Sequence, residues 1–361
     1  MTSSRPTVGI VGLGYGRAHI SAFQANGCEV VAVCQRNQAT AKAVADAYGV
    51  PRVFERWEAM LEDVRPEIVV IATPPHLHLA IAGAAFAAGA HVLCEKPLAM
   101  SRAEARAMVD AAVRAGRIGM TGFNWRFAVA MQRFHAMVSE DAVGRVFHIG
   151  ARWLGARWAD EASAPTWRMD RAQAGVGAMG DMGVHVVDFI RWNFGEFTRV
   201  SARAGIAYGN RSAPGVNRPP DAEDFCTVVA DLASGAQATL TVSRTAHGVN
   251  EHSLEAYGSR GAVSYRMLRD EPRWWAGELR AAGSGAMLQP VPVDPAPDVT
   301  DRDPMDVIGK ALIAPLVARF LGAIRTGRSA SPSLEDGLRA QAVLDAVVES
   351  STQGGWVDVA H

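Results

Sequence analysis

Apolar and polar residues follow two different patterns in the two parts of this chain. In the first third, runs that are apolar throughout, such as TVGIVG and EIVVIAT, alternate with stretches whose apolar residues recur at helical spacing. Strands that are buried on both faces and separated by helices predict a parallel sheet covered on both sides. We therefore expect residues 1–122 to form a doubly wound α/β domain.

The same pattern predicts the individual elements of this domain. Strands are expected in TVGIVG, EVVAVC, EIVVIAT and HVLCEKP, and helices in residues 18–25, QATAKAVADAYG, RWEAMLED, HLHLAIAGAAFAAG and SRAEARAMVDAAVRAG. Gly49 is expected to end the second helix. Ser101 and Glu104 have the spacing of a capping box at the start of the last one.

From about Phe123 the apolar residues recur at every second position. In RVFHIGARW, one side of a strand carries Phe147, Ile149, Ala151 and Trp153, and QATLTVS and EHSLEAYG alternate in the same way. Such strands, joined by turns like ASGA, predict an antiparallel sheet with unlike faces. Residues 123–361 are therefore expected to form an α+β domain that ends in the helix SLEDGLRAQAVLDAVVESS. The proline-rich stretches APGVNRPPDAED and QPVPVDPAPDVTDRDP are expected to be loops.

Composition argues against several classes of protein. A formal net charge of −1 provides no basic surface for nucleic acid or anionic lipid, and 49% apolar with 20% charged residues is typical of soluble globular proteins. The most apolar run, LAIAGAAFAAGAHVLC, is interrupted by Gly89 and His91, so we expect no membrane span, and the N-terminus lacks a signal-peptide pattern. Four scattered cysteines without a C-x-x-C pair argue against a zinc site and against disulfides, so we expect no metal and a reducing cytoplasm.

The stretch VGIVGLGYGRAH combines a predicted strand, a glycine loop and the start of a helix. In this setting backbone N–H groups bind a pyrophosphate at a helix N-terminus. Gly12 and Gly14 fit G-x-G, but Arg17 stands where the third glycine of G-x-G-x-x-G belongs, and Gly16 comes one residue early. The loop, with Tyr15, is expected to bind a dinucleotide; an ordinary tight turn is the alternative.

The end of the second predicted strand bears on the choice of cofactor. An acid at this position binds the ribose 2′-hydroxyl of NAD, and an arginine accommodates the 2′-phosphate of NADP. Here Gln35 and Arg36 follow the strand, without an acid. Gln35 does not repel a phosphate, and Arg36 can pair with it, so NADP is favoured over NAD. The alternative is that Arg36 only faces solvent.

Two further predicted strands are followed by residues that could take part in binding or catalysis, in the stretches ATPPHLH and CEKP. Ligands of an open α/β sheet bind beyond the carboxyl ends of its strands. Thr73 and Pro74 are expected to form a rigid wall there, and His78 either to reach the nicotinamide or to cap its own helix. Lys96 is expected to face the same crevice, where partial desolvation lowers the pKa of an amine; the alternative is a structural ion pair with an acid such as Glu95. We also expect the Lys96–Pro97 peptide bond to be cis.

In the second half, GDMGVHVVDFIRW places an acid and a histidine one helical turn apart. Asp181 and His185 are at i and i+4, so they share a helix face and can deliver an acid–base pair to a pocket. The alternative is that Asp181 is an N-cap and His185 a core histidine. Aromatic and cationic residues that could line a substrate pocket are Trp153, Arg157, Trp158, Trp167 and Arg168.

Taken together, these stretches resemble the Gfo/Idh/MocA family of NAD(P)-dependent oxidoreductases, which act mostly on sugars and cyclitols. The matching stretches run in the family's order: GLGYG with His19 after it, ATPPHLH, CEKPLA, GFNWRF, TWRMDRAQAGVGAMGDMGVHVVD and SLEDGLRAQAVLDAVVESS. The resemblance implies a Rossmann domain followed by a domain with a large open sheet. In the family that sheet commonly forms the oligomer interface, so a homodimer or homotetramer is expected.

The resemblance also implies roles for single residues. Lys96, Asp181 and His185 match residues that act on the reacting hydroxyl, the aspartate orienting the other two. Trp167 and Arg168 match an element near the cofactor, Asn124 a stretch at the domain junction, and Glu95 the acid of the family's EKP motif. The expected reaction is hydride transfer between a nicotinamide and a carbinol carbon of a sugar-like polyol. His185 would handle the proton and Lys96 would stabilise the alkoxide.

Two other functions are compatible with these residues. Some relatives retain the cofactor and hydrolyse glycosides through a transient oxidation, without net change in NAD(P)H. A non-catalytic NADP-sensing protein could use the same fold, although a sensor does not need Lys96, Asp181 and His185 together.

Overall fold

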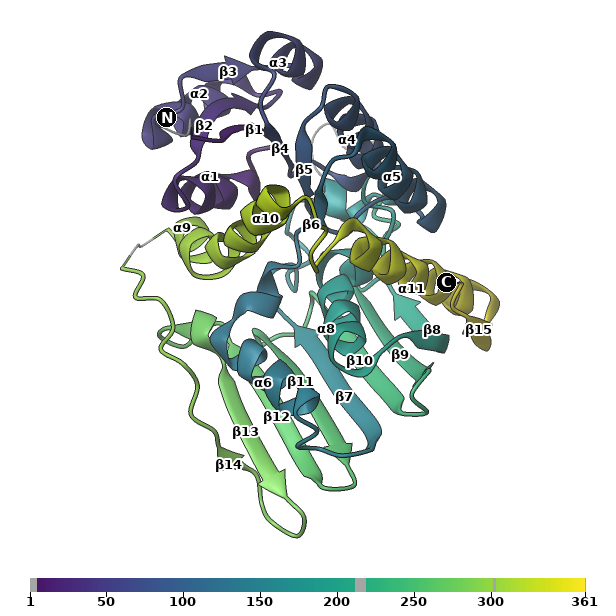
Figure 1. Cartoon of the computed structure of the whole chain (residues 1–361). Coiled ribbons are helices and arrows are strands. Elements are labelled where there is room, and N and C mark those ends of the chain that lie inside the picture. Colours follow the sequence, from purple (N-terminus) through teal and green to yellow (C-terminus); the bar gives the residue numbers. More distant parts are fainter. Residues whose placement is uncertain (1–4, 212–218, 301–302, 361) are drawn as a thin grey trace. The chain divides into compact units, whose positions relative to one another are not determined.

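The computed structural model describes residues 5–211, 219–300 and 303–360, which form two compact units (Figure 1). The first unit comprises the chain up to Ala99, together with Ala103–Phe127 and Pro297–Leu338. The second comprises Met100–Arg102, Ala128–Ala296 and the chain from Arg339 onward. The chain therefore passes between the two units more than once, because a late segment returns to the first unit. The single boundary expected near residue 123 describes only one of these passages.

The first unit contains a six-stranded parallel sheet in the order β3-β2-β1-β4-β5-β6. Its strands are β1 (Thr7–Val11), β2 (Glu29–Cys34), β3 (Arg52–Phe54), β4 (Ile68–Ile71), β5 (His91–Cys94) and β6 (Gly119–Thr121). Every residue of β4 is buried, as its uninterrupted apolar run predicts. The order of connection reverses between β1 and β4, which is where such sheets bind ligands.

Helices between the strands complete the predicted doubly wound arrangement. They are α1 (Gly16–Ala25), α2 (Gln38–Tyr48), α3 (Trp57–Val64), α4 (His78–Ala87) and α5 (Arg102–Ala115). Gly49 ends α2 in the left-handed conformation, with φ of 68°, as predicted. Two short 3-10 helices follow strands, η1 (Pro75–Leu77) and η2 (Asn124–Phe127). The Lys96–Pro97 peptide is cis, also as predicted.

A late segment of the chain adds three helical pieces to this unit. They are α9 (Pro304–Ile308), the π-helical η6 (Gly309–Ile313) and α10 (Ala314–Thr326), and all three contact α1. Gly309 lies against the Ala18 carbonyl, where a Cβ would collide with the α1 backbone. The returning segment is thus fitted closely to α1.

Within the described residues, the helical stretch Pro304–Thr326 is long and apolar enough to cross a membrane. Its mean hydropathy is 1.8, and 56% of that window is buried inside the protein. A helix packed in a protein core passes the same test, so the stretch is weak evidence for a membrane span. The most apolar run noted in the sequence lies elsewhere, in α4 and β5.

The second unit is built on a nine-stranded sheet in the order β14-β13-β12-β11-β7-β10-β9-β8-β15. Its strands are β7 (Val146–Leu154), β8 (Phe197–Gly205), β9 (Phe225–Leu232), β10 (Gln237–Ser243), β11 (Glu251–Gly258), β12 (Gly261–Leu268), β13 (Glu278–Gly283), β14 (Gln289–Pro290) and β15 (Trp356–Asp358). Among the strands that the structure describes in this sheet, only β7 and β10 pair in parallel. The sheet is therefore mainly antiparallel, as predicted.

Helices α6 (Val129–Ser139) and α8 (Val184–Phe194) pack against strands of this sheet (Figure 1). The remaining helical elements are α7 (Arg171–Ala174), α11 (Leu334–Gln353), the 3-10 turns η3 (Trp167–Met169) and η5 (Trp274–Ala276), and the π-helical η4 (Met179–Gly183). The helix expected at the end of the chain is α11, and it buries Leu338, Val343, Leu344 and Val347.

The alternation expected in the strands is correct in part. In β10, Ala238, Leu240 and Val242 are buried. In β7, Ile149, Ala151 and Trp153 are buried, but Phe147 is 47% exposed. In β11 the alternation fails, because its first four residues are all buried. Its acid Glu251 is enclosed on the polar face by Arg152 at 2.6 Å and by Arg266.

The proline-rich stretches and the cysteines complete this comparison. APGVNRPPDAED lies partly outside the described residues, and so do two residues of the other stretch, whose described part before α9 contains only the short β14. All four cysteines are free and buried. Burial raises the pKa of Cys28 to about 11 and those of Cys34 and Cys226 to about 12, so these thiols are poor nucleophiles.

Candidate active site

The strands of the first unit end at a common edge, which brings the residues after them together. The backbone N–H of Ala72 donates to the last carbonyl of β1, that of Glu95 to the last carbonyl of β4, and that of Gly122 to the last carbonyl of β5, each at 2.8 Å. The residues that follow β1, β4, β5 and β6 are therefore neighbours, as the parallel sheet predicts.

The three glycines of the loop after β1 serve three different purposes. Gly12 has φ of 90°, and a Cβ there would lie 2.5 Å from the Ala72 carbonyl oxygen, so the chain itself requires glycine. Gly14 is exposed and has open space where a Cβ would point. Gly16 begins α1, with its Cβ position 3.2 Å from Ile10. Gly16 thus provides the close helix–strand packing that G-x-G-x-x-G assigns to its third glycine, although it comes one residue early.

Tyr15 connects this loop to η2. Its hydroxyl accepts a hydrogen bond from Nδ2 of Asn124 at 3.3 Å, and its ring stands edge-on to His19, with centroids 6.2 Å apart. Asn124 is 1% exposed, and its Oδ1 has no hydrogen-bond partner. An amide oxygen left unpaired at this edge is able to accept a hydrogen bond from a ligand.

Gln35 and Arg36, the two residues that follow β2, have different surroundings. The Leu13 N–H donates to Oε1 of Gln35 at 3.5 Å, so the Gln35 side chain supports the glycine loop. Arg36 is exposed and precedes Asn37, which caps α2 by accepting a hydrogen bond from the Thr40 N–H. An exposed guanidinium beside a helix N-terminus suits an anion.

His78 has neither of the two roles considered from the sequence. It is fully buried, with Nδ1 3.1 Å from the Leu98 carbonyl and Nε2 2.9 Å from the Thr73 carbonyl. A neutral ring has one N–H and donates to one of these two oxygens. Burial lowers the pKa of His78 despite the nearby carbonyls and Glu95. His78 joins the two loops after β4 and β5 from inside.

Thr73 and Pro74 lie in the same loop, directly before η1. The Oγ1 of Thr73 is buried and has no hydrogen-bond partner. In the described part of the first unit, three buried side-chain polar atoms share that property: Thr73 Oγ1, Asn124 Oδ1 and His19 Nδ1. Two of them belong to residues predicted to bind the cofactor. Together with the open space above Gly14, they fit a dinucleotide, which carries many hydrogen-bonding groups.

Lys96 follows Glu95 at the end of β5 and is half-buried. Glu95 is 6% exposed, and its Oε1 lies 2.8 Å from Nε2 of His19. Its Oε2 accepts a hydrogen bond from the backbone N–H of Lys96 at 3.3 Å. Glu95 therefore has a structural position beneath the loop. His19 was visible in the sequence only as part of the family motif.

Asp181 and His185 lie in the second unit on one continuous helical stretch. Asp181 is inside η4, which begins at Met179 and continues into α8, so Asp181 is not an N-cap. His185 is 3% exposed and stacks on Trp153, with ring centroids 5.4 Å apart. Trp153 also stacks on His252, with ring centroids 4.2 Å apart. The ring of His185 is thus held in a defined orientation.

Arg168 is brought directly to Asp181. Its Nε donates to Oδ1 of Asp181 at 3.1 Å, and its guanidinium lies 4.3 Å from the centre of the Trp167 ring. Nη1 of Arg244 donates to the Arg168 carbonyl at 3.0 Å, and Arg244 forms a buried ion pair with Asp224 at 2.8 Å. The sequence did not predict the ion pair of Arg244 with Asp224. Its only sign in the sequence is that Asp224 directly precedes β9 and Arg244 directly follows β10.

The proposed aromatic lining is only partly available to a substrate. Trp153 and Trp158 are 5% and 6% exposed, because Trp153 stacks on two histidines and the guanidinium groups of Arg157 and Arg244 lie over Trp158. These two tryptophans are core residues. Arg157 is exposed, and Trp167 and Arg168 are half-buried.

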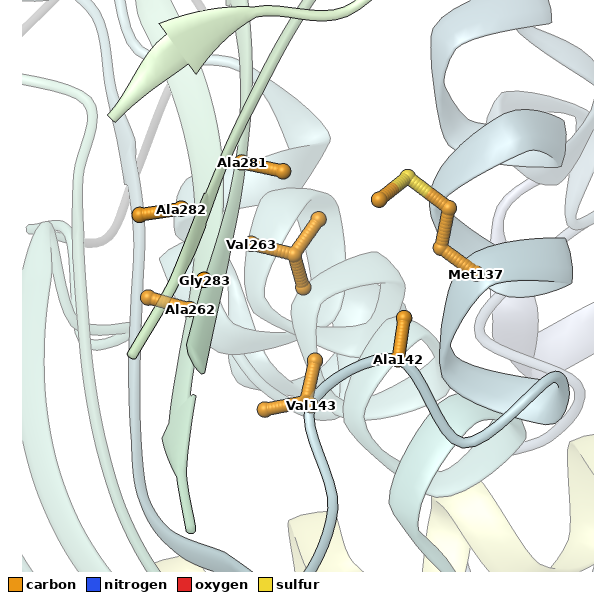
Figure 2. Close-up of a pocket in the computed structure, with 8 residues that line it drawn as sticks. All are labelled: Met137, Ala142, Val143, Ala262, Val263, Ala281, Ala282 and Gly283. Carbon is orange, nitrogen blue, oxygen red and sulfur yellow. The ribbon is translucent and has the colours of Figure 1, made fainter. Parts of the chain in front are cut away.

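A separate pocket of about 240 Å³ lies in the second unit, between the end of α6 and strands β12 and β13 (Figure 2). Its lining is Met137, Ala142, Val143, Ala262, Val263, Ala281, Ala282 and Gly283. None of these side chains carries a polar group, and none is a predicted site residue. This pocket has no chemistry to offer an oxidoreductase reaction.

Two family profiles match the chain. One, described as an oxidoreductase family with an NAD-binding Rossmann fold, matches residues 7–123, and the other, described as a GFO/IDH/MocA C-terminal domain, matches residues 131–264. This chain belongs to the Gfo/Idh/MocA family of oxidoreductases. Family membership confirms the resemblance seen in the sequence and accounts for the two kinds of sheet.

Relatives in the Gfo/Idh/MocA family include several sugar dehydrogenases. Levoglucosan dehydrogenase of Pseudarthrobacter phenanthrenivorans is 32% identical over 98% of this chain and 97% of its own length. D-xylose 1-dehydrogenase (NADP(+)) 2 of Haloferax volcanii is 28% identical over 98% of both chains. A solved structure of levoglucosan dehydrogenase with NADH and levoglucosan has a TM-score of 0.88 at 29% identity, covering 99% of this chain and all of that one.

Proposed function

We propose that this protein is an NAD(P)-dependent dehydrogenase that acts on a CH–OH group of a sugar, cyclitol or related small polyol. The observation that carries this proposal is the pairing of Asp181 with Arg168 one turn before the ordered ring of His185, in a chain whose first unit has a dinucleotide loop. Lys96 lies in the first unit, and Asp181 and His185 lie in the second. That all three act on one substrate remains our prediction.

The first unit supplies the residues that would hold the cofactor. The backbone of Gly12, Gly14 and Gly16 at the start of α1 suits the pyrophosphate, and the unpaired oxygens of Thr73 and Asn124 suit its polar groups. When bound, a nicotinamide cofactor supplies the acceptor or donor of the hydride. We further propose a preference for NADP, since Arg36 rather than an acid follows Gln35.

Three side chains would manage the proton and the charge on the substrate oxygen. Oxidation of an alcohol releases a proton as the hydride leaves, so a base must lie within hydrogen-bond reach of the hydroxyl. His185 serves as that base, and Asp181, fixed by Arg168, orients the reacting groups. The ammonium of Lys96 stabilises the negative charge that develops on the oxygen.

A substrate screen tests this proposal. The purified protein is assayed with NADP⁺ and NAD⁺ against sugars and cyclitols, and with NADPH and NADH against small carbonyl compounds, read at the nicotinamide absorbance. We expect turnover with at least one polyol and its loss, by a factor of 100 or more, in Lys96→Ala. Lys42→Ala, which changes an exposed lysine of α2, is the matched control. Full turnover in Lys96→Ala would remove that residue from the reaction.

Two other outcomes of the screen would point to other functions. A cofactor that survives purification, with glycoside cleavage and no net change in NAD(P)H, would indicate a glycosidase. Tight NADP binding without any turnover would indicate a sensor.

We also propose that a second copy of this chain covers the face of the nine-stranded sheet opposite α6 and α8. Strand β9 buries Cys226, Val228 and Ala230 on one side, whereas Phe225 and Val229 are 43% and 39% exposed on the other. We expect Val229→Lys to reduce the mass measured by light scattering to that of a monomer, and Val113→Lys, at a 75% exposed position of α5, to leave it unchanged. A monomeric parent protein would refute this assembly.

A further inference from the structure

His19 and Glu95 form a buried contact between α1 and the end of β5. The residues are 76 positions apart in the chain, and Nε2 of His19 lies 2.8 Å from Oε1 of Glu95. His19 is fully buried and Glu95 is 6% exposed. A carboxylate removed from water in this way is strongly destabilising unless a partner is present, so the contact is a structural necessity for Glu95.

The surroundings of His19 and Glu95 indicate which atoms of the pair donate and which accept hydrogen bonds. Nε2 of His19 faces a carboxylate oxygen at 2.8 Å, and a carboxylate oxygen accepts, so we assign a ring proton to Nε2; Nδ1 has no hydrogen-bond partner. His19 then donates to Glu95, and the free oxygen of Glu95 accepts from the Lys96 backbone N–H at 3.3 Å.

Gly122 also lies against the Glu95 carboxylate. A Cβ at position 122 would lie 2.7 Å from Oε1 of Glu95, so glycine at the end of β6 leaves room for this carboxylate. The carboxylate is therefore enclosed by His19 of α1, by Gly122, and by the backbone of Lys96. Each of these contacts restricts where the chain can place residue 96.

We propose that His19 is a positioning residue, which holds Glu95 so that the backbone of Lys96 is fixed. This inference rests on the proposed function, in which the Lys96 ammonium stabilises charge on the substrate oxygen. A displacement of about 1 Å can reduce a rate about 100-fold, because the stabilising charge no longer coincides with the developing one. His19 does not contact the substrate in this scheme, and its effect passes through Glu95.

The test compares two substitutions at position 19. His19→Ala removes the donor, whereas the amide of His19→Gln can donate to Glu95 in its place. We expect His19→Ala to lower kcat at least tenfold with less than threefold change in the KM for NAD(P), and His19→Gln to recover most of the loss. Ser21→Ala, a buried residue of the same helix, serves as the control.

A second readout does not depend on turnover. Amide hydrogen exchange at Lys96, measured without added cofactor, should be at least tenfold faster in His19→Ala and close to the parent rate in His19→Gln. If His19→Ala does not fold, Gly122→Ala displaces the same carboxylate and should lower kcat in the same way. Parent-like exchange and turnover in whichever of these variants folds would overturn the inference. Parent-like turnover in Lys96→Ala would instead overturn the proposed function.

Discussion

The Nε of Arg168 lies 3.1 Å from Oδ1 of Asp181, so a residue expected beside the cofactor is bound to a residue expected beside the substrate. Both side chains are partly exposed, 26% for Arg168 and 20% for Asp181. An ion pair of this kind contributes little to stability and can contribute much to the orientation of a carboxylate. The first prediction follows from that difference.

Replacing Arg168 by methionine should affect catalysis more than stability. We expect Arg168→Met to lower kcat/KM for the polyol at least tenfold, about 1.4 kcal/mol, and to change the free energy of unfolding by less than about 1 kcal/mol. Steady-state kinetics and urea unfolding measure the two quantities. Arg133→Met, which breaks the exposed pair with Glu140, should change neither. A loss of stability that accounts for the loss of activity would contradict the orienting role.

Substitution of Arg36 should distinguish the two cofactors. Arg36→Ala removes an exposed guanidinium beside the start of α2, and we expect about tenfold weaker NADPH binding with NADH binding within a factor of two. Fluorescence titration of both reduced cofactors measures this. Arg56→Ala, which changes an exposed arginine directly before α3, is the control. Equal losses for both cofactors would refute a contact with the 2′-phosphate.

Alanine at Gly12 and at Gly14 should separate folding from cofactor binding. Gly12→Ala forces a Cβ against the Ala72 carbonyl at positive φ, and we expect it to lower the free energy of unfolding by about 1–3 kcal/mol. Gly14→Ala meets no atom of the chain, so stability should stay within about 1 kcal/mol while NAD(P)H affinity falls at least tenfold. Thermal unfolding and cofactor titration test both variants. Parent-like cofactor affinity in Gly14→Ala would mean that the loop is only a turn.

The buried His252 should make stability depend on pH. Burial, followed by the charge of Arg269, keeps the pKa of His252 well below its usual value of 6.5. In the unfolded chain this imidazole takes up a proton below about pH 6.5, so the contribution is fully present above that pH and is lost as the pH falls. From pH 6.5 to 5.5 the loss is about 1 kcal/mol.

The measurement compares urea unfolding at pH 7.5, 6.5 and 5.5 for the parent and for His252→Gln. The variant should lack this part of the pH dependence, whatever its absolute stability. His247→Gln, at an exposed loop position, should retain it. An unchanged pH dependence in His252→Gln would mean that the pKa of His252 is the same in the folded and the unfolded chain, which contradicts the effect of burial.

The sequence predicted features that depend on neighbouring residues. Uninterrupted apolar runs located β1, β2, β4 and β5, and the ends of β1, β4 and β5 located the loops with Gly12, Thr73 and Lys96. Period-two alternation located β10 because only one of its faces is buried. These signals are local, so they can be read without knowledge of the partner strands.

Features that depend on distant residues were missed or misread. His78 looked available because its two carbonyl partners belong to loops whose approach only the folded sheet creates. The contact of His19 with Glu95 and the ion pair of Asp224 with Arg244 each join separate elements. Gly16 seemed misplaced because the motif counts residues, whereas its role is set by the distance to Ile10 on β1.

Because residues 297–338 return to the first unit, the apolar core of that unit is completed late in synthesis. Leu334 and Leu338 belong to the apolar core of that unit, and the N–H of Thr121 on β6 donates to the Pro332 carbonyl at 3.0 Å. The whole second sheet up to β14 leaves the ribosome before these partners do. Until residue 338 has emerged, the part of the amino-terminal core that Leu334 and Leu338 cover is therefore open to chaperones.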